Sequence, residues 1–176
     1  MLPTEIQLTR SRLRPWRTSD RASLLRYAND RDVWRNLRDR FPHPYTERDA
    51  DEWLSLVTSE DPPIGIYAIE VDGEAAGTIA VEPGPDIERW CWEIGYWLGQ
   101  PFWGRGIVTE AVIAVSDAAF REPDVIRLHA PVFSWNRRSM RVLEKAGYVR
   151  EGLLRQSAIK EGKIRDQLLF ATYKPL

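Results

Sequence analysis

Hydrophobic residues repeat with two different periods along this chain, and segments of the two kinds follow one another. Apolar residues at every second position predict β-strands, and apolar residues three or four positions apart predict helices. The strands are expected over residues 6–15, 64–71, 75–81, 90–98, 125–133, 148–159 and 163–173. The helices are expected over residues 18–29, 32–38, 46–57, 107–120 and 136–146. The pattern therefore predicts about seven strands and four to five helices.

Turn and capping residues mark several ends of these elements. Thr46 and Asp49 have the spacing of a capping box, which predicts a helix start. Gly147 follows the last expected helix, where glycine commonly ends helices. Asp72-Gly73 and Glu161-Gly162 each separate two expected strands, and such dipeptides predict hairpin turns.

The connections between strands indicate the topology. The strands over residues 90–98 and 125–133 are joined through a helix, so we expect them to be parallel. The hairpins join antiparallel neighbours, so the fold class is expected to be α/β with a mixed central sheet flanked by helices. No linker, repeat or low-complexity tract interrupts the 176 residues, which suit one domain. We therefore expect residues 1–176 to form a single domain.

Composition excludes several classes of protein. The net charge of −1 does not indicate a polyanion-binding surface, although it leaves room for a local basic patch, so nucleic acid is not expected as a partner. One cysteine, Cys91, excludes an internal disulfide framework, and with two histidines the chain has no convincing metal-ligand spacing. We therefore expect His129 on its strand to be structural, while His43 lies in a loop that can edge a pocket. The sequence shows no secretory signal and no long apolar run, which favours a cytoplasmic location without membrane contact.

A glycine-punctuated turn is the most informative feature of the sequence. Gly104 and Gly106 lie between the strand over residues 90–98 and the helix over residues 107–120. Such a turn gathers unpaired backbone N–H groups at the positive end of a helix, which suits a phosphate or pyrophosphate. No Gly-Lys-Ser/Thr sequence of a P-loop occurs, and Thr109 stands where a dinucleotide fingerprint needs its third glycine. The turn therefore predicts a different kind of nucleotide-like cofactor site.

The residues around this turn resemble the GNAT acyl-CoA N-acyltransferases. The first motif is Glu-Ile-Gly-Tyr-Trp-Leu at 93–98, followed by Trp-Gly-Arg-Gly at 103–106 and Thr-Glu-Ala at 109–111. The second is Asn136, Ser139 and then Leu-Glu-Lys-Ala-Gly-Tyr at 143–148. The chain is most similar to the branch that includes the ribosomal-protein N-terminal acetyltransferases, and the resemblance spans nearly its whole length.

The resemblance implies acetyl-CoA as acyl donor and a splayed pair of parallel strands that holds it. The pantetheine arm is expected in that gap, against the backbone of Tyr96, Trp97 and Leu98. The remaining cofactor contacts are expected on Trp103, Gly104, Arg105, Gly106, Ile107, Val108, Thr109, Asn136 and Ser139. Relatives often carry Gln or Arg where this chain has Pro101. Phosphate binding should therefore rest on backbone N–H groups, with Arg105 as an electrostatic helper and Thr109 as a hydroxyl donor.

Acyl transfer from a thioester to an amine needs a neutral amine, a donor for the developing oxyanion and a proton for the departing thiolate. Glu93 is the first candidate base, because it lies on the strand just before the cofactor turn; its alternative role is to pair with an arginine. Asp166, in the last hairpin, is the rival base. Ser139 is the candidate proton donor, since many relatives have a tyrosine where this chain has Leu143. Asn136 is expected to cap the helix, to contact the cofactor, or both.

The resemblance leaves the acceptor open. We expect direct attack by a primary amine in a ternary complex, with a protein or peptide N-terminal α-amine as the first choice. A small-molecule amine, such as a polyamine, an aminoglycoside or an amino acid, is the alternative. A non-catalytic acyl-CoA-binding protein is a third interpretation. A homodimer through the last strands or an aromatic face also stays open.

Overall fold

The computed structural model describes residues 1–174, and their eight strands form one mixed sheet. The strands are β1 (Ile6–Gln7), β2 (Arg12–Arg14), β3 (Ile66–Val71), β4 (Glu74–Pro83), β5 (Cys91–Leu98), β6 (Arg127–Phe133), β7 (Val149–Lys160) and β8 (Lys163–Tyr173). The α-helices are α1 (Arg21–Ala28), α2 (Arg31–Trp34), α3 (Glu47–Val57), α4 (Ile107–Phe120) and α5 (Arg137–Lys145). The order across the sheet is β1-β2-β3-β4-β5-β6-β8-β7, with β5 and β6 as the parallel pair. The expected α/β class with a mixed sheet is confirmed.

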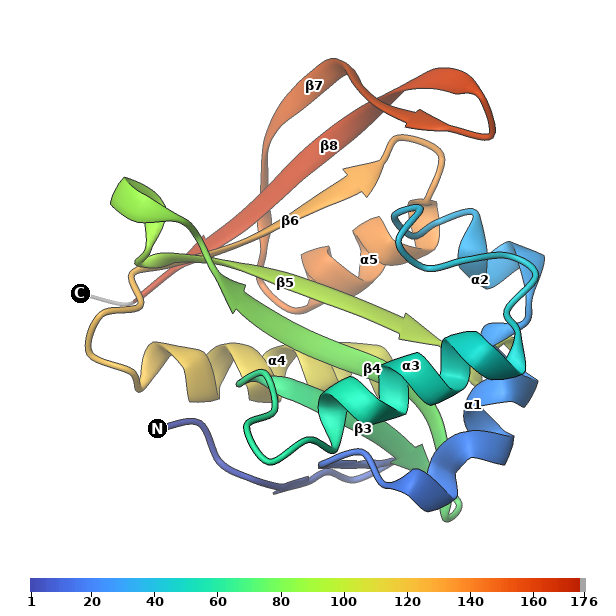
Figure 1. Cartoon of the computed structure of the whole chain (residues 1–176). Coiled ribbons are helices and arrows are strands. Elements are labelled where there is room, and N and C mark those ends of the chain that lie inside the picture. Colours follow the sequence, from blue (N-terminus) through green and yellow to red (C-terminus); the bar gives the residue numbers. More distant parts are fainter. Residues whose placement is uncertain (175–176) are drawn as a thin grey trace.

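Helices cover both faces of the sheet, and each face has its own buried cluster (Figure 1). On one face α4 packs with a stripe at helical spacing, in which Ile107, Ala111 and Val115 are fully buried. On the other face Leu24 of α1 and Leu54 of α3 pack against the sheet. No helix among the described residues is both long enough and apolar enough to cross a membrane.

The local signals for element ends are confirmed. Thr46 is the N-cap of α3, and the reciprocal hydrogen bonds with Asp49 complete the capping box. Asp72 and Gly73 both have positive φ values, 52° and 84°, as the tight turn between β3 and β4 requires. Gly147, with φ 85°, follows α5 in the left-handed conformation that ends many helices.

The expected strand over residues 6–15 is wrong, because this segment forms two short strands. The Leu8 N–H donates to the Ser11 carbonyl at 2.9 Å, which closes a turn, and β1 then pairs antiparallel with β2. The strand count rises to eight for this reason. The expected helix over residues 32–38 is also shorter, since α2 ends at Trp34 and irregular backbone follows.

The parallel strands diverge soon after they begin to pair. Their ladder joins Cys91, Trp92 and Glu93 of β5 to Arg127, Leu128 and His129 of β6, and it ends there. Beyond Glu93, β5 continues to pair with β4, and β6 continues to pair with β8. Figure 1 shows the two strands separating toward the carboxyl end of β5. The edge of β5 that faces this gap therefore offers backbone groups without a strand partner.

Candidate functional site

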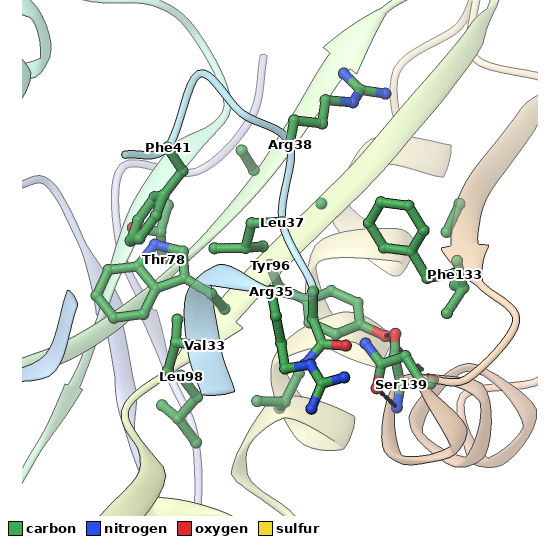
Figure 2. Close-up of a pocket in the computed structure, with 18 of the residues that line it drawn as sticks. Val33, Arg35, Leu37, Arg38, Phe41, Thr78, Tyr96, Leu98, Phe133 and Ser139 are labelled. Atoms are coloured by element: carbon green, nitrogen blue, oxygen red, sulfur yellow. Dashed lines mark hydrogen bonds between the residues drawn. The ribbon is translucent and has the colours of Figure 1, made fainter. Parts of the chain in front are cut away.

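The gap between β5 and β6 opens into a cleft of about 1920 Å³. One part of it is lined by the turn before α4 and by α5, and another part by residues 35–42 and the ends of β4, β6 and β7. Figure 2 shows Arg35 and Leu37 between Phe41 and Thr78 on one side and Phe133 and Ser139 on the other. The cleft therefore joins the expected cofactor region to a second region, which is lined by residues 35–42 and the ends of β4, β6 and β7.

The turn before α4 has the geometry of an anion site. Gly104 and Gly106 have φ values of 75° and 78°, which side chains other than glycine rarely adopt. Gly106 is the N-cap of α4 without a side-chain cap, and the first N–H paired within the helix belongs to Glu110. The N–H groups of Ile107, Val108 and Thr109 therefore point out of a 14-residue helix at its positive end, and all three residues line the cleft.

Trp103 and Arg105 leave this turn in different directions. The Trp103 indole N–H donates to the Leu98 carbonyl at 2.6 Å, which ties the turn to the end of β5, and its ring lines the cleft. Arg105 does not line the cleft: its guanidinium lies over the Phe102 ring and 3.9 Å from Asp72. Arg105 was expected to help bind phosphate, but its side chain points toward the β3–β4 turn.

A basic stripe on α5 faces the cleft and was not predicted from the sequence. Arg137, Arg141 and Lys145 are spaced by four residues and therefore share one side of the helix, and Arg138 lies beside them. Among the described residues, none of the four has a carboxylate within 4.0 Å. Arg138 stacks over Trp103, with 4.7 Å between its guanidinium carbon and the ring centre. The i, i+4, i+8 spacing was the available signal for this stripe.

The hydroxyl groups of Ser139 and Tyr96 meet at the start of α5. The Asn136 side chain accepts the Ser139 N–H at 3.2 Å, so Asn136 caps the helix. The Tyr96 and Ser139 hydroxyl oxygens are 2.8 Å apart, and burial raises the pKa of Tyr96 above its ordinary value. Leu143 is fully buried in the core. A tyrosine hydroxyl from β5 thus lies next to the serine, a contact that the sequence did not indicate.

Glu93 is held by an arginine from the segment after α2. The Arg38 guanidinium Nη2 lies 2.6 Å from each carboxylate oxygen of Glu93, and both side chains are partly exposed. Glu82 stands directly opposite Glu93 on β4, and Arg40 binds it at 3.2 Å. Both carboxylates line the cleft, and both arginines come from one loop.

The other candidate acid–base residues have structural contacts. The Asp166 carboxylate accepts the Gln156 N–H at 2.8 Å, within an irregular part of the β7–β8 ladder, and Asp166 does not line the cleft. His43 stacks on Trp34 outside the cleft lining. Cys91 has a free thiol on β5. Within residues 1–174, no group of three or more His, Cys, Asp or Glu side chains is arranged to hold a metal ion.

His129 lies beside Glu93 in the parallel ladder, in surroundings that favour its neutral form. Burial, and to a lesser extent the charge of Arg127, lowers the pKa of the imidazole below its usual value of 6.5. Below pH about 6.5 the unfolded chain therefore binds a proton that the folded chain does not, and the free energy of unfolding falls as the pH falls.

We expect His129→Gln to lose less stability than the wild type between pH 7.5 and 5.5 in urea unfolding. Equal losses in the two proteins would contradict this expectation.

Comparison with known proteins identifies the family. The family model described as "Acetyltransferase (GNAT) domain" matches residues 10–149. YjcK of Bacillus subtilis, described as a probable N-acetyltransferase, is 44% identical over 82 residues, which are 47% of this chain and 45% of YjcK. The [ribosomal protein uS5]-alanine N-acetyltransferase of Escherichia coli is 30% identical over 82 residues, 47% of this chain and 42% of that protein. These matches span somewhat under half the length of each relative.

A solved structure extends the similarity over the whole fold. Mycobacterium smegmatis RimJ in complex with CoA-disulfide has a TM-score of 0.81 at 27% identity, covering 97% of this chain and 88% of RimJ. The fold and the family match thus define an acetyltransferase class of protein. The chain belongs to the GNAT acetyltransferase family.

Proposed function

We propose that this protein transfers the acetyl group of acetyl-CoA to the N-terminal α-amine of a protein or peptide. The observation that carries the proposal is the union, in one cleft, of an uncapped helix start and a carboxylate on the adjoining strand. The first suits the pyrophosphate of CoA, and the second suits an amine. The peptide acceptor is supported by the relative named as an acetyltransferase of ribosomal protein uS5.

The residues of the cleft fit the donor. The N–H groups of Ile107, Val108 and Thr109 are the donors for the pyrophosphate, with Gly104 and Gly106 giving the backbone its conformation. The edge of β5 from Tyr96 to Leu98 is the partner for the pantetheine amides. The arginines of α5 add positive charge where the CoA phosphates would enter, which is the role expected of Arg105 from the sequence. Thr109 can add its hydroxyl to the same set.

Direct attack needs no enzyme nucleophile. Glu93 accepts the proton of the acceptor ammonium, directly or through water, after its contact with Arg38 has opened. The neutral nitrogen attacks the carbonyl carbon of the thioester, and the amide bond forms as the carbon–sulfur bond breaks. Backbone N–H groups on the free edge of β5 donate to the thioester oxygen, on which charge develops. The Ser139 hydroxyl donates a proton to the departing sulfur and regains one, directly or through water, from the attacking nitrogen, which gives up its second proton to become the amide. Tyr96 holds that hydroxyl in place.

A thiol-release assay with acetyl-CoA tests the proposal. The acceptor panel contains peptides beginning with Ala, Ser or Met, together with spermidine, an aminoglycoside and free amino acids. We expect acceptor-dependent release of CoA with peptides, and acetylation of the α-amine in the product mass spectrum. Release with the small amines alone would replace the peptide acceptor with the alternative class. An increase in melting temperature with acetyl-CoA, but no release with any amine, would favour a binding protein.

The pairing of Tyr96 with Ser139 gives a second expectation. Ser139→Ala should lower kcat about tenfold, and Tyr96→Phe should lower it less, because the serine stays but loses its buried partner. If the two hydroxyls act as one unit, the double variant should be no slower than Ser139→Ala. The measurement is steady-state kinetics of the three variants with the preferred acceptor.

Tyr148→Phe is the matched control for this pair. Tyr148 also shares a buried hydroxyl contact of 2.8 Å with a serine, Ser116, and neither residue lines the large cleft. We expect this variant to change stability and leave kcat unaltered. Fully additive effects of Tyr96→Phe and Ser139→Ala would contradict a shared role.

A further inference from the structure

Residues 31–43, which we call the strap, border the part of the cleft that also includes the ends of β4, β6 and β7, and we call this part the acceptor part. Contacts with other segments fix the strap in place. The buried Lys160 ammonium lies 2.7 Å from the Asp39 carboxylate, and the Trp135 indole N–H donates to the Asn36 side chain at 3.0 Å. Arg31 and Glu161 form a third contact at 2.8 Å. These contacts join the strap to β7, to the turn after it and to the loop after β6. The strap therefore holds its charged side chains at fixed places over the cleft.

Two glutamate–arginine pairs lie beneath the strap. Glu82 and Glu93 face each other across β4 and β5, and like charges in that position repel. Arg38 and Arg40 from the strap neutralise them. The cluster has no net charge. The next pair on the same face of the sheet, Ala80 and Gly95, is small, and a Cβ at Gly95 would meet no atom within 4 Å. An acceptor can therefore reach Glu93 over the small residues of β4 and β5 without meeting a large side chain from them.

An amine that binds Glu93 must replace Arg38. A polyamine bound to Glu93 would leave Arg38 without a carboxylate. If its second ammonium bound Glu82, Arg40 would also lose its carboxylate. An acceptor with both an ammonium and a nearby carboxylate would behave differently. Its ammonium would bind Glu93 in place of Arg38, and its carboxylate would bind the released Arg38. The acceptor part of the cleft thus favours a molecule that carries both charges.

Two further arginines, Arg35 and Arg165, lie near the cleft, and the carboxylate with which both interact electrostatically, Glu161, is already bound by Arg31. Arg35 lines the cleft, and its nearest carboxylate, Asp32, is at the limiting distance of 4.0 Å. Arg165 stacks over Trp135, a residue of the cleft lining, and its Nε is buried without a hydrogen-bond partner. Arg165 itself does not line the cleft, so of the two only Arg35 can meet an acceptor there. Arg35, which lines the cleft, can therefore add its charge to that of a released Arg38 when an acceptor carboxylate binds.

We propose that the acceptor peptide carries an acidic side chain within its first two residues. Its α-ammonium replaces Arg38 on Glu93, and its carboxylate binds the Arg38 guanidinium that is released. This proposal rests on the proposed transfer to a peptide N-terminus and adds the substrate class of that same site. The direct contact between Arg38 and Glu93 requires the two charges on the acceptor to be close, which limits the acid to the first two residues.

Two pairs of short peptides test the proposal. Their C-termini are amidated, so that no terminal carboxylate can bind the arginines. The first pair is Ala-Asp-Ala-Ala and Ala-Asn-Ala-Ala, and the second is Asp-Ala-Ala-Ala and Asn-Ala-Ala-Ala. We expect kcat/KM to favour aspartate over asparagine by about tenfold in at least one pair, as for a charged hydrogen bond. In Arg38→Gln the ratio within that pair should fall to about one. Comparing ratios within each variant cancels any general change in turnover.

Arg31→Gln is the matched control, because it removes a different ion pair of the same strap away from Glu93. This variant should keep the aspartate preference. Acetylation of all four peptides with a ratio near one would overturn the acidic preference and leave the proposed function intact. Preference for spermidine, or for a lysine peptide, would overturn it in favour of a cationic acceptor. No acetylation of any peptide would refute both the peptide acceptor and this inference.

Discussion

Replacing Gly104 with valine is expected to raise the dissociation constant for acetyl-CoA by about 100-fold, or about 2.7 kcal/mol. Gly104 has a φ of 75°, which a β-branched residue adopts only with strain, and its missing Cβ leaves open space in the cleft. A valine would both shift the turn and occupy the space beside the N–H groups at the start of α4. Gly106→Val should have the same effect, since its φ is 78°. Isothermal titration calorimetry with acetyl-CoA measures the change.

Gly73→Val separates cofactor binding from general backbone strain. Gly73 also has a positive φ, 84°, and open space around its missing Cβ, but it lies in the β3–β4 turn and does not line the cleft. Its valine variant should lose similar stability and keep its affinity for acetyl-CoA. If Gly104→Val bound acetyl-CoA as tightly as Gly73→Val, the assignment of an anion site to the start of α4 would be wrong.

The parts of the fold that follow from local signals could be predicted from the sequence. The stripe of α4, the capping box at Thr46 and the turn at Asp72-Gly73 depend on residues within a few positions of one another. The turn at Leu8–Ser11 was missed because the residues on both sides keep an alternating pattern that a single strand would also show. Whether residues 1–176 form a single domain stays a prediction.

The site was harder to predict, because its decisive contacts join residues far apart in the sequence. The Arg38–Glu93 pair spans 55 positions, and Lys160–Asp39 spans 121. Nothing local to Arg38 indicates that partner, although the sequence did leave an arginine partner open for Glu93. The side chain of Tyr96 was overlooked for a related reason: the family resemblance directed attention to its backbone, while its hydroxyl meets Ser139 across 43 positions. The roles of the candidate site residues stay proposals.

Replacing Glu93 with glutamine is expected to lower kcat about 100-fold with little change in affinity for acetyl-CoA. The amide keeps the size of the side chain and can still accept a hydrogen bond from Arg38, but it cannot take the acceptor proton. The loss should therefore appear in turnover and not in donor binding, because Glu93 lies at the end of the β5–β6 ladder and away from the turn before α4. Steady-state kinetics and calorimetry on the same preparation give both values.

Glu82→Gln tests whether the effect belongs to Glu93 or to the negative charge of the region. Glu82 lies directly opposite on β4, lines the same cleft and has its own arginine from the strap, so the two variants remove the same charge from adjacent positions. If Glu93 is the base, the Glu82→Gln variant should keep most of the kcat of the wild type. Equal losses would mean that the pair acts through its electrostatic field on the acceptor. Full activity of Glu93→Gln across the pH range would rule out the base assignment. Asp166→Asn would then decide between the rival carboxylate, which holds the Gln156 N–H, and proton transfer to water alone.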